Sequence, residues 1–479
     1  MTDHSRQGGE AATAPAVSAA AESTAAEEST NAEGSTAAEG STVTAAAPRS
    51  PGDRLTGIDA ARGFALLGIF LVNIDFMALP LGVITAPAGG SVAEVVARSF
   101  VAIFCEGKFY PLFSLLFGAG LVLQMRSVER RGGRFVPLYL RRLAVLAAIG
   151  LTHALLLWYG DILLMYAAVG VVVLAAVRLL GARGLAIAGV AAWLLAGLLL
   201  GGLSMFEPPV PAEERASRDE LLAEALAIEL DESPLRSLVT MVEQASSQST
   251  LVDEPQWMAA EIAAYRDGPY LQALGFRAMS FGFVFLVYLF GGALDILAMF
   301  LLGAALCRWG LFDAGGENAA RGEKWLLRLV GLAMLVGLPG SAFSHLAPDV
   351  VGGYLGNLLQ EMLRVYCGPF LSAGMLAGLV LLARSGLARA LVDALAAAGR
   401  MALSNYLLQT LIGTFVTYHW GLGMFGRLGA LDRIWLVVGV FVAQVLLSQW
   451  WLQRFRFGPM EWLWRSATYW RRQPMRRGA

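Results

Sequence analysis

The chain of 479 residues carries little charge for its length. Only 15 % of the residues are Asp, Glu, Lys or Arg, and 57 % belong to the AVILMFWYC set. Average soluble domains hold about 25 % charged residues. This composition excludes a soluble enzyme, a disordered regulator and a nucleic-acid-binding protein, and it predicts a protein that crosses the lipid bilayer several times. The formal net charge of −1 gives no global field that would attract an anionic partner.

Cysteine is also scarce, and several catalytic motifs are missing. Cys105, Cys307 and Cys367 all lie in apolar segments without CxxC spacing, so we expect neither a disulfide framework nor a metal site. The chain contains no P-loop, HExxH, dinucleotide-binding or GxSxG motif, which argues against ATP hydrolysis and zinc proteolysis. We therefore expect no tightly bound cofactor.

The apolar segments predict an all-α, polytopic membrane helix bundle. Residues 1–53 repeat Ala, Glu, Ser, Thr and Gly and are expected to form a disordered cytoplasmic tail, followed by a transmembrane domain at 54–470. We expect about ten transmembrane helices, at 61–80, 109–126, 142–159, 162–180, 184–204, 278–307, 325–344, 365–384, 401–419 and 434–452. The apolar stretch 91–106 is shorter and is expected to be interfacial or re-entrant.

The distribution of Arg and Lys predicts that both termini are cytoplasmic. With the N-terminus inside, the cytoplasmic loops hold 22 basic residues and the opposite loops hold 9. Residues 205–275 then form an acidic extracytoplasmic loop with an amphipathic helical stretch near 218–230. Residues 471–479 form a basic cytoplasmic tail.

The first apolar segment carries two polar pairs that invite functional hypotheses. Asp59 and Arg62 lie on one helical face at the cytoplasmic edge. They either anchor the helix as an ion pair, or Arg62 holds an anionic ligand that Asp59 helps to orient. Asn73 and Asp75 lie toward the far end of the same helix and are expected to face a polar cavity.

The segment RRLAVLAAIGLTHALLLWYGDILLMYAAVG predicts an antiparallel helical hairpin that turns at WYGD. His153 lies about 9 Å below the turn, at 1.5 Å per residue, and Asp161 is at the turn itself. A histidine that meets a carboxylate suits general-base chemistry near neutral pH. The alternative is a structural histidine bonded across helices.

Three further polar residues lie in later apolar segments. Asp295 follows a Gly-Gly pair in FGGALDILAMFLLG, which suggests a local helix break of the kind that marks ligand sites in transporters. Asn405 and Gln409 lie four residues apart on one helical face. They either join helices or contact a ligand.

Together these segments resemble the YeiB-like bacterial membrane proteins, a family of unknown function. The matching pieces are GIDAARGFALLGIFLVNI, EGKFYPLFSLLFGAG, RRLAVLAAIGLTHALLLWYGDILLMYA, GRMALSNYLLQTLI and FRFGPMEWLWR. That family is distantly similar to transmembrane acyltransferases, including the acyltransferase-3 enzymes and the heparan-α-glucosaminide N-acetyltransferases. The latter share the D-x-x-RG pattern found here at Asp59, Arg62 and Gly63.

The resemblance implies a membrane acyltransferase of the bacterial plasma membrane. Such an enzyme takes an acyl group from acyl-CoA and delivers it to a small-molecule, lipid or glycan acceptor. Here His153 would be the base and Asp161 would orient it. Arg62, Arg141 and Arg142 would contact the CoA phosphates, with Asp59 beside them. The stretch DFMALPLGVITAPAGG, where the N-acetyltransferases place their histidine, has none, so His153 is chosen on chemical grounds.

Two other functions fit the same sequence. Ten spans with polar groups inside them also suit a small-molecule transporter or exporter, although no internal repeat is evident. A non-catalytic scaffold or sensor would use the acidic 205–270 loop as its partner surface.

Overall fold

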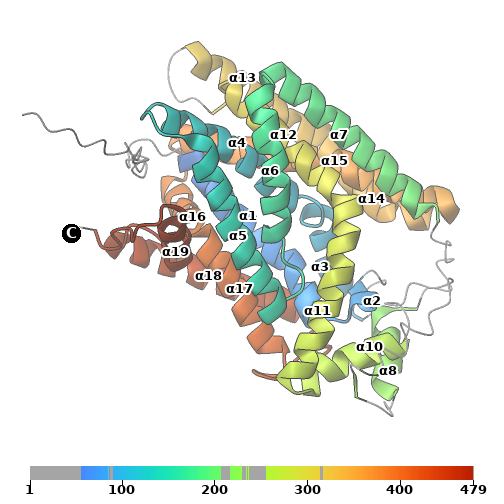
Figure 1. The fold of residues 1–479 in the computed structure, drawn as a ribbon. Helices are drawn as coiled ribbons and strands as arrows, with labels where there is room; N and C mark the ends of the chain where they lie inside the picture. Colours follow the sequence, from blue (N-terminus) through green and yellow to red (C-terminus); the bar gives the residue numbers. More distant parts are fainter. Residues whose placement is uncertain are drawn as a thin grey trace, which may run out of the picture. The chain divides into compact units, whose positions relative to one another are not determined.

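Helices make up the whole architecture of the computed structural model (Figure 1). The structure describes residues 56–84, 86, 90–206, 216–228, 233–234, 236, 255–312 and 317–477. The prediction for the tail at 1–53 lies outside these residues. No β-strand occurs in the described ranges, where Phe455 and Arg476 form an isolated bridge. The all-α prediction is confirmed.

The first half of the chain forms helices up to a long connection after Ser204. They are α1 (Thr56–Ala78), α2 (Leu81–Ile84), α3 (Val92–Phe104), α4 (Phe109–Glu129), α5 (Phe135–Leu156), α6 (Leu163–Leu179) and α7 (Ala182–Ser204). The short apolar stretch forms α3, and a tight turn at Cys105–Lys108 joins it to α4. The expected hairpin is also present, with α5 and α6 on either side of WYGD.

The second half adds the loop helices and the remaining spans. They are α8 (Arg218–Ala227), α10 (Pro255–Ile262), α11 (Tyr270–Val287), α12 (Ala293–Arg308), α13 (Glu317–Leu332), α14 (Leu338–Val350), α15 (Gly353–Ser385), α16 (Arg389–Arg400), α17 (Ala402–Thr417), α18 (Ala430–Arg454) and α19 (Pro459–Thr468). The amphipathic stretch near 218–230 is α8, which begins with a capping box between Ser217 and Glu220.

Eight helical stretches in the described residues are long and apolar enough to cross a membrane. They are 56–78, 92–129, 135–156, 182–204, 270–287, 320–350, 353–385 and 430–454. Every one of the ten expected segments is helical, but α6 and α17 have only 17 and 16 residues. A span of about 30 Å needs about 20 residues, so these two fall short of the expected length. The protein is a multi-pass membrane protein.

Hydrogen bonds divide the loops into two groups, one at each end of the bundle. At the first end, Trp464 Nε1 donates to the Arg142 carbonyl at 2.8 Å, and Leu403 N donates to Glu461 Oε1 at 2.7 Å. We call this the inner end because its loops are the ones predicted to be cytoplasmic.

The opposite group of loops forms the outer end. Gly426 N donates to the Ala78 carbonyl at 2.7 Å, and His419 N donates to the Tyr265 carbonyl at 2.8 Å. Helices α8 and α10 lie beside α2 at this end (Figure 1). The loops that these contacts join are ones that the predicted alternation places on the same side.

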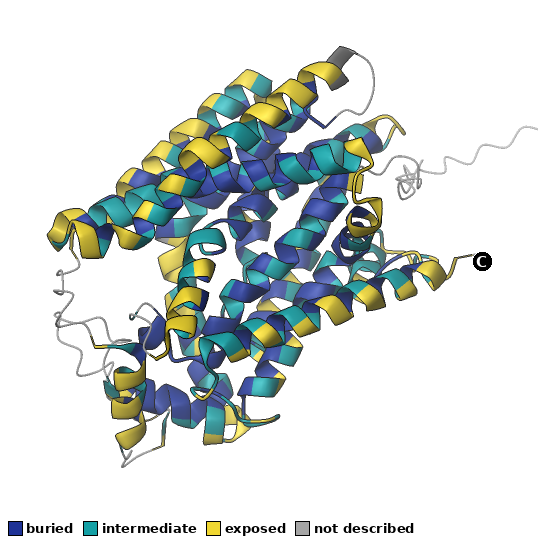
Figure 2. Cartoon of the chain, turned by 180° about the vertical axis from the view of Figure 1, so that it is seen from behind, coloured by how far each residue is buried: buried dark blue, intermediate teal, exposed yellow. Residues whose placement is uncertain are grey.

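Helix α1 lies in the interior, whereas large apolar side chains on α7, α11 and α18 are exposed. Figure 2 shows exposed residues on the outward faces of peripheral helices and buried residues inside the bundle. A bundle in lipid exposes apolar side chains on its periphery and packs small residues where helices cross closely. Gly63 of α1 and Gly399 of α16 are such residues. A Cβ at Gly63 would lie 1.9 Å from the Leu395 carbonyl oxygen, and one at Gly399 would lie 1.8 Å from that of Asp59.

A buried glutamate at the outer end predicts a pH dependence of stability. Glu261 of α10 is 1 % exposed and accepts a hydrogen bond from Leu81 N at 2.9 Å. Burial raises the pKa of Glu261 from 4.5 to about 8. Between those two values the unfolded chain releases the proton and the folded chain keeps it, so a rising pH favours unfolding.

We expect the melting temperature of the detergent-solubilised protein to fall between pH 5 and pH 8. Glu261→Gln should flatten that slope, since it removes a penalty on the order of a few kcal/mol at pH 8. Glu220→Gln is the matched control. Glu220 is exposed, and hydrogen bonds from Ser217 lower its pKa below 4.5, so it does not titrate in this window. Equal slopes in the wild type and Glu261→Gln would contradict the assignment.

Candidate active site

His153 and Asp161 form a buried pair at the hairpin turn. His153 Nδ1 lies 2.8 Å from Asp161 Oδ2, and the two side chains are 1 % and 0 % exposed. The other carboxylate oxygen, Oδ1, accepts a hydrogen bond from Leu164 N at 2.9 Å and so caps the start of α6. The predicted contact between the two residues is confirmed.

The local sequence explains how the pair comes together. Gly150 precedes His153 by nearly one turn of α5, and a Cβ at Gly150 would lie 2.7 Å from Asp161 Oδ1 and from Leu164 N. The glycine thus lets the beginning of α6 approach α5 closely. Trp158 Nε1 and Tyr159 Oη both donate to the Phe76 carbonyl at 3.3 Å, which ties the turn to α1.

The second ring nitrogen of His153, Nε2, is not in contact with Asp161. Because the carboxylate of Asp161 accepts at Nδ1, the neutral imidazole carries its proton there and presents an unprotonated Nε2. This Nε2 is buried and has no hydrogen-bond partner among the described residues. The rings of Tyr406 and Trp158 lie near it, with centroids 5.3 Å and 6.4 Å from that of His153. The arrangement is that of a general base held by a carboxylate.

The arginines expected to contact CoA gather at the inner end. Arg62 Nη1 lies 3.0 Å from Asp59 Oδ1, as the i,i+3 spacing predicts. The Arg142 guanidinium stacks on the Trp464 ring at 3.7 Å and is close enough to Arg62 for their charges to interact. Arg141 is half-buried next to it.

The structure does not bring these arginines to the histidine. Arg141 and His153 lie twelve residues apart on α5, which corresponds to about 18 Å along the helix. The two groups of candidate residues therefore occupy different depths of the same bundle.

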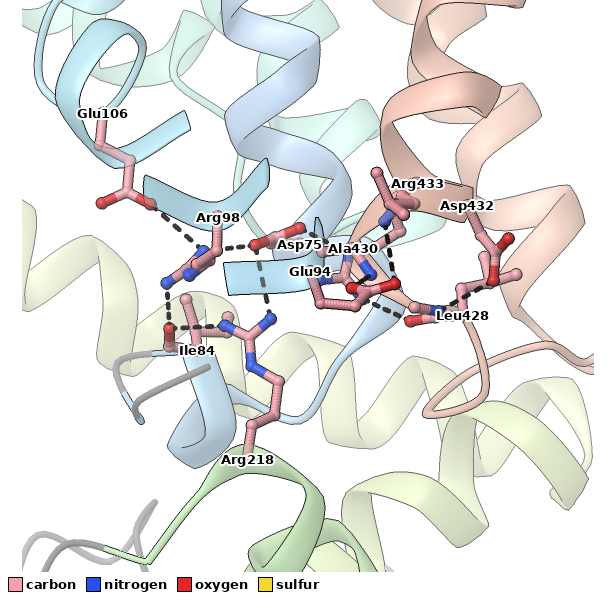
Figure 3. A network of polar contacts seen from close by, with 12 residues as sticks. Asp75, Ile84, Glu94, Arg98, Glu106, Arg218, Leu428, Ala430, Asp432 and Arg433 are labelled. Atoms are coloured by element: carbon pink, nitrogen blue, oxygen red, sulfur yellow. Dashed lines mark hydrogen bonds and ion pairs between the residues drawn. The ribbon is translucent and has the colours of Figure 1, made fainter. Parts of the chain in front are cut away.

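Asp75 belongs to a network of arginines at the outer end, shown in Figure 3. It pairs with Arg98 at 2.6 Å and with Arg433 at 2.7 Å. Arg98 lies in the apolar stretch that forms α3, and only its charge within that stretch could have indicated a role. Asn73, two residues before Asp75 on α1, is half-buried.

Asp295 lies inside the bundle beside Tyr110. The tyrosine hydroxyl donates to Asp295 Oδ2 at 2.8 Å, and Oδ1 is buried without a partner in the described part of the chain. The expected break at Gly-Gly is not an unwound segment. The chain continues through a π-helical turn at Tyr288–Gly292, which joins α11 to α12. Such turns widen a helix by one residue without exposing its backbone to lipid.

Asn405 and Gln409 join helices. Asn405 Nδ2 donates to the Ala398 carbonyl at 3.1 Å and to Ser448 Oγ at 3.0 Å. Gln409 Nε2 donates to Gln444 Oε1 at 3.0 Å, and Gln444 Nε2 donates to the Asn405 carbonyl at 3.0 Å. Of the two hypotheses for these residues, these contacts favour the structural one.

No cluster of three His, Cys, Asp or Glu side chains that could hold a metal ion occurs within the described ranges. The three cysteines are buried and form no disulfide with one another.

The fold and the buried pair define a polytopic helical membrane protein with a histidine–aspartate site inside the bundle. The sequence profile of the family described as protein of unknown function (DUF418) matches residues 306–471. The uncharacterized protein YeiB of Escherichia coli is 33 % identical over 423 residues, which cover 87 % of this chain and 96 % of the relative. The chain belongs to this YeiB-like family, as its motifs indicated.

Two relatives from Bacillus extend the comparison. The uncharacterized protein YxaH of Bacillus subtilis is 30 % identical over 440 residues, covering 90 % of this chain and 98 % of the relative. An uncharacterized 39.9 kDa protein from the amylase 3′ region of Bacillus acidopullulyticus is 27 % identical over 430 residues. The match to the Bacillus acidopullulyticus protein covers 89 % of this chain and 97 % of the relative.

Proposed function

We propose that this protein is an acyltransferase of the bacterial plasma membrane, which moves an acyl group from acyl-CoA to a small-molecule, lipid or glycan acceptor. The observation that carries the proposal is the buried His153–Asp161 pair with its unpartnered Nε2. A neutral imidazole with an unprotonated ring nitrogen can accept a proton. A carboxylate that holds the other nitrogen stabilises the imidazolium that results.

The proposed step is an ordinary acyl transfer. His153 Nε2 takes the proton from an acceptor hydroxyl or amine as its oxygen or nitrogen attacks the thioester carbonyl. The C–S bond then breaks, the imidazolium returns its proton to the CoA thiolate, and the acylated acceptor leaves. Asp161 keeps the ring in the required tautomer throughout and does not itself exchange a proton.

The inner arginines support the donor side of the proposal. Arg62, Arg141 and Arg142 form a basic group next to the cytoplasm, where acyl-CoA is available, and guanidinium groups bind phosphates in a forked geometry. The distance of about 18 Å along the helix between this group and His153 requires the pantetheine arm of CoA, which carries the thioester, to enter the bundle. The acceptor would then meet it from the outer half of the membrane.

The test is the release of CoA from acetyl-CoA by the detergent-purified protein, with membrane extract as a pool of acceptors. We expect a time-dependent release of free thiol that requires both the protein and the extract. Absence of both release and binding for acetyl-CoA and a long-chain acyl-CoA would contradict the proposal.

The buried Asp295 favours a transporter as the second candidate function. A carboxylate with one unpartnered oxygen inside a membrane span, next to a π-helical turn, suits the binding of a proton or a cationic solute. A transporter would move an unmodified solute into proteoliposomes without acyl-CoA, whereas an acyltransferase would leave a modified product.

A further inference from the structure

Three arginine side chains from three different helices surround the Asp75 carboxylate at the outer end (Figure 3). Arg98 of α3 donates to Oδ2 at 2.6 Å, and Arg433 of α18 donates to Oδ1 at 2.7 Å. Arg218, the first residue of α8, lies 3.9 Å from Oδ2. Both oxygens of Asp75 are therefore already engaged before Arg218 is considered.

Arg218 is the least satisfied member of this cluster. Its Nη2 donates to the Ile84 carbonyl at 3.1 Å, and its Nη1 lies beyond hydrogen-bond distance of Asp75. Its Nε is buried and meets no acceptor in the residues that the structure describes, although Arg218 as a whole is only 6 % exposed. Burial and the neighbouring Arg98 lower the pKa of Arg218 to about 10. A buried guanidinium with so few hydrogen-bond acceptors is unfavourable unless another anion accepts its remaining hydrogen bonds.

In the described residues, the other carboxylates around the cluster contact groups other than Arg218. Glu106 lies 3.2 Å from Arg98 Nη1. Glu94 accepts hydrogen bonds from the backbone of Ala430 at 2.6 Å and of Leu431 at 3.5 Å. Asp432 accepts one from Gly429 N at 3.1 Å, also at the start of α18. These acids balance the charge of the region, but neither Glu94 nor Asp432 supplies an acceptor to Arg218.

We propose that Arg218, together with Arg98 and Arg433, forms a binding site for the phosphate group of an anionic ligand on the extracytoplasmic side. A tetrahedral oxyanion accepts forked hydrogen bonds from Nε and Nη of a guanidinium, and the Nε of Arg218 has no acceptor in the described residues. The ligand is either a soluble phosphate compound or the headgroup of an anionic lipid, since the cluster lies where the bundle leaves the membrane. The site is distinct from the His153–Asp161 pair and does not depend on acyl transfer.

The negative charge of Asp75 allows a test in which two substitutions should change the affinity for phosphate in opposite directions. Its carboxylate competes with the ligand for the arginines and repels an incoming anion. Removing that charge should therefore strengthen phosphate binding, and removing the charge of Arg218 should weaken it. A purely structural network predicts instead that both changes only lower stability.

The test uses the full-length protein in detergent, titrated with inorganic phosphate at constant ionic strength set with chloride. We expect phosphate to raise the melting temperature of the wild type, and Arg218→Gln to need at least about tenfold more phosphate for the same rise. Asp75→Asn should need less phosphate than the wild type. Arg266→Gln is the matched control, because Arg266 lies at the outer end and pairs with its neighbour Asp267 at 2.8 Å; its titration should equal that of the wild type.

A second arm separates the two sources of the phosphate. Mixed micelles with phosphatidylglycerol are compared with micelles containing phosphatidylcholine. Stabilisation by inorganic phosphate identifies a soluble ligand, and stabilisation by phosphatidylglycerol alone identifies a lipid headgroup; either supports the site if Arg218→Gln removes it. If Arg218→Gln does not fold, Arg218→Lys replaces it, because lysine keeps the charge and lacks the fork. Equal responses of Arg218 and Arg266 variants, or no response to either ligand, would overturn the proposal.

Discussion

His153→Gln is expected to abolish CoA release by the purified protein. A positioned general base contributes about 10²–10⁴-fold to the rate of such a transfer, and glutamine provides no group that takes up a proton at neutral pH. Because the imidazole lies away from the inner arginines, the KM for acyl-CoA should change little and the loss should fall on kcat. Steady-state assays of thiol release at varied acyl-CoA concentrations measure both quantities.

Asp161→Asn is expected to give a similar loss with an intact fold. The amide oxygen of asparagine can still accept from Leu164 N, so α6 keeps its cap. Its NH₂ group would donate to His153 Nδ1, which forces the ring proton onto Nε2 and removes the base. If Asp161 had no part in catalysis, Asp161→Asn would release CoA at the rate of the wild type.

His419→Gln provides the matched control. His419 lies at the same end of the bundle, and its contact with Tyr265 is made by its backbone N–H, which the substitution retains. Activity of this variant should equal that of the wild type. Full activity in His153→Gln would reject the assigned base while leaving open an enzyme that uses another residue.

The largest effect on stability is expected from Gly399→Ala. A methyl group there would lie 1.8 Å from the Asp59 carbonyl oxygen, so α1 and α16 would have to separate. Forced overpacking of this kind typically costs about 1–3 kcal/mol, and both partners here are rigid backbone. We expect a markedly lower melting temperature in detergent. Gly63→Ala, on the opposing helix, should act in the same direction.

Gly378→Ala tests whether the close approach of α1 and α16 causes the loss of stability expected of Gly399→Ala. Gly378 lies in α15, and nothing within 4 Å would meet its Cβ. Alanine favours a helix over glycine by about 0.5–1 kcal/mol, so this variant should be at least as stable as the wild type. Equal destabilisation of the Gly399 and Gly378 variants would show that helix crossing at Gly399 is not the reason.

The position of Gly399 also connects the stability of the fold with the arginines proposed to bind CoA. The residue packs against the turn of α1 that begins with Asp59, and Arg62 pairs with that aspartate one turn later. A displaced α16 would shift the inner arginines. We therefore expect Gly399→Ala to raise the KM for acyl-CoA in any fraction that remains folded.

Several structural features follow from short-range pattern in the sequence. A membrane helix is predicted from an apolar run of sufficient length, and the hairpin is predicted from a short turn between two such runs. The contact between His153 and Asp161 follows from the same local geometry, because eight residues across one tight turn leave few other places for the two side chains. The pairing of Asp59 with Arg62 is likewise fixed by the i,i+3 spacing.

The sequence indicates the π-helical turn at Tyr288–Gly292 only in part. The Gly-Gly pair before Asp295 indicated an irregularity, but a wider turn and an unwound break have the same sequence signal. In lipid, the requirement that every backbone group be hydrogen-bonded favours the wider turn. The roles of Asn405 and Gln409 were open for a related reason, since an amide side chain joins helices or binds a ligand according to what faces it.

The sequence by itself determined the membrane class, the helices, the grouping of loops and the local pair at the hairpin. Only the tertiary structure decided which charges meet at the outer end. Asp75 and Arg433 lie 358 positions apart, and Arg218 reaches the same carboxylate from a loop helix. Periodicity and spacing describe neighbours within about two helical turns, whereas these contacts depend on how α1, α3, α8 and α18 pack, which is set by the shape of the whole bundle.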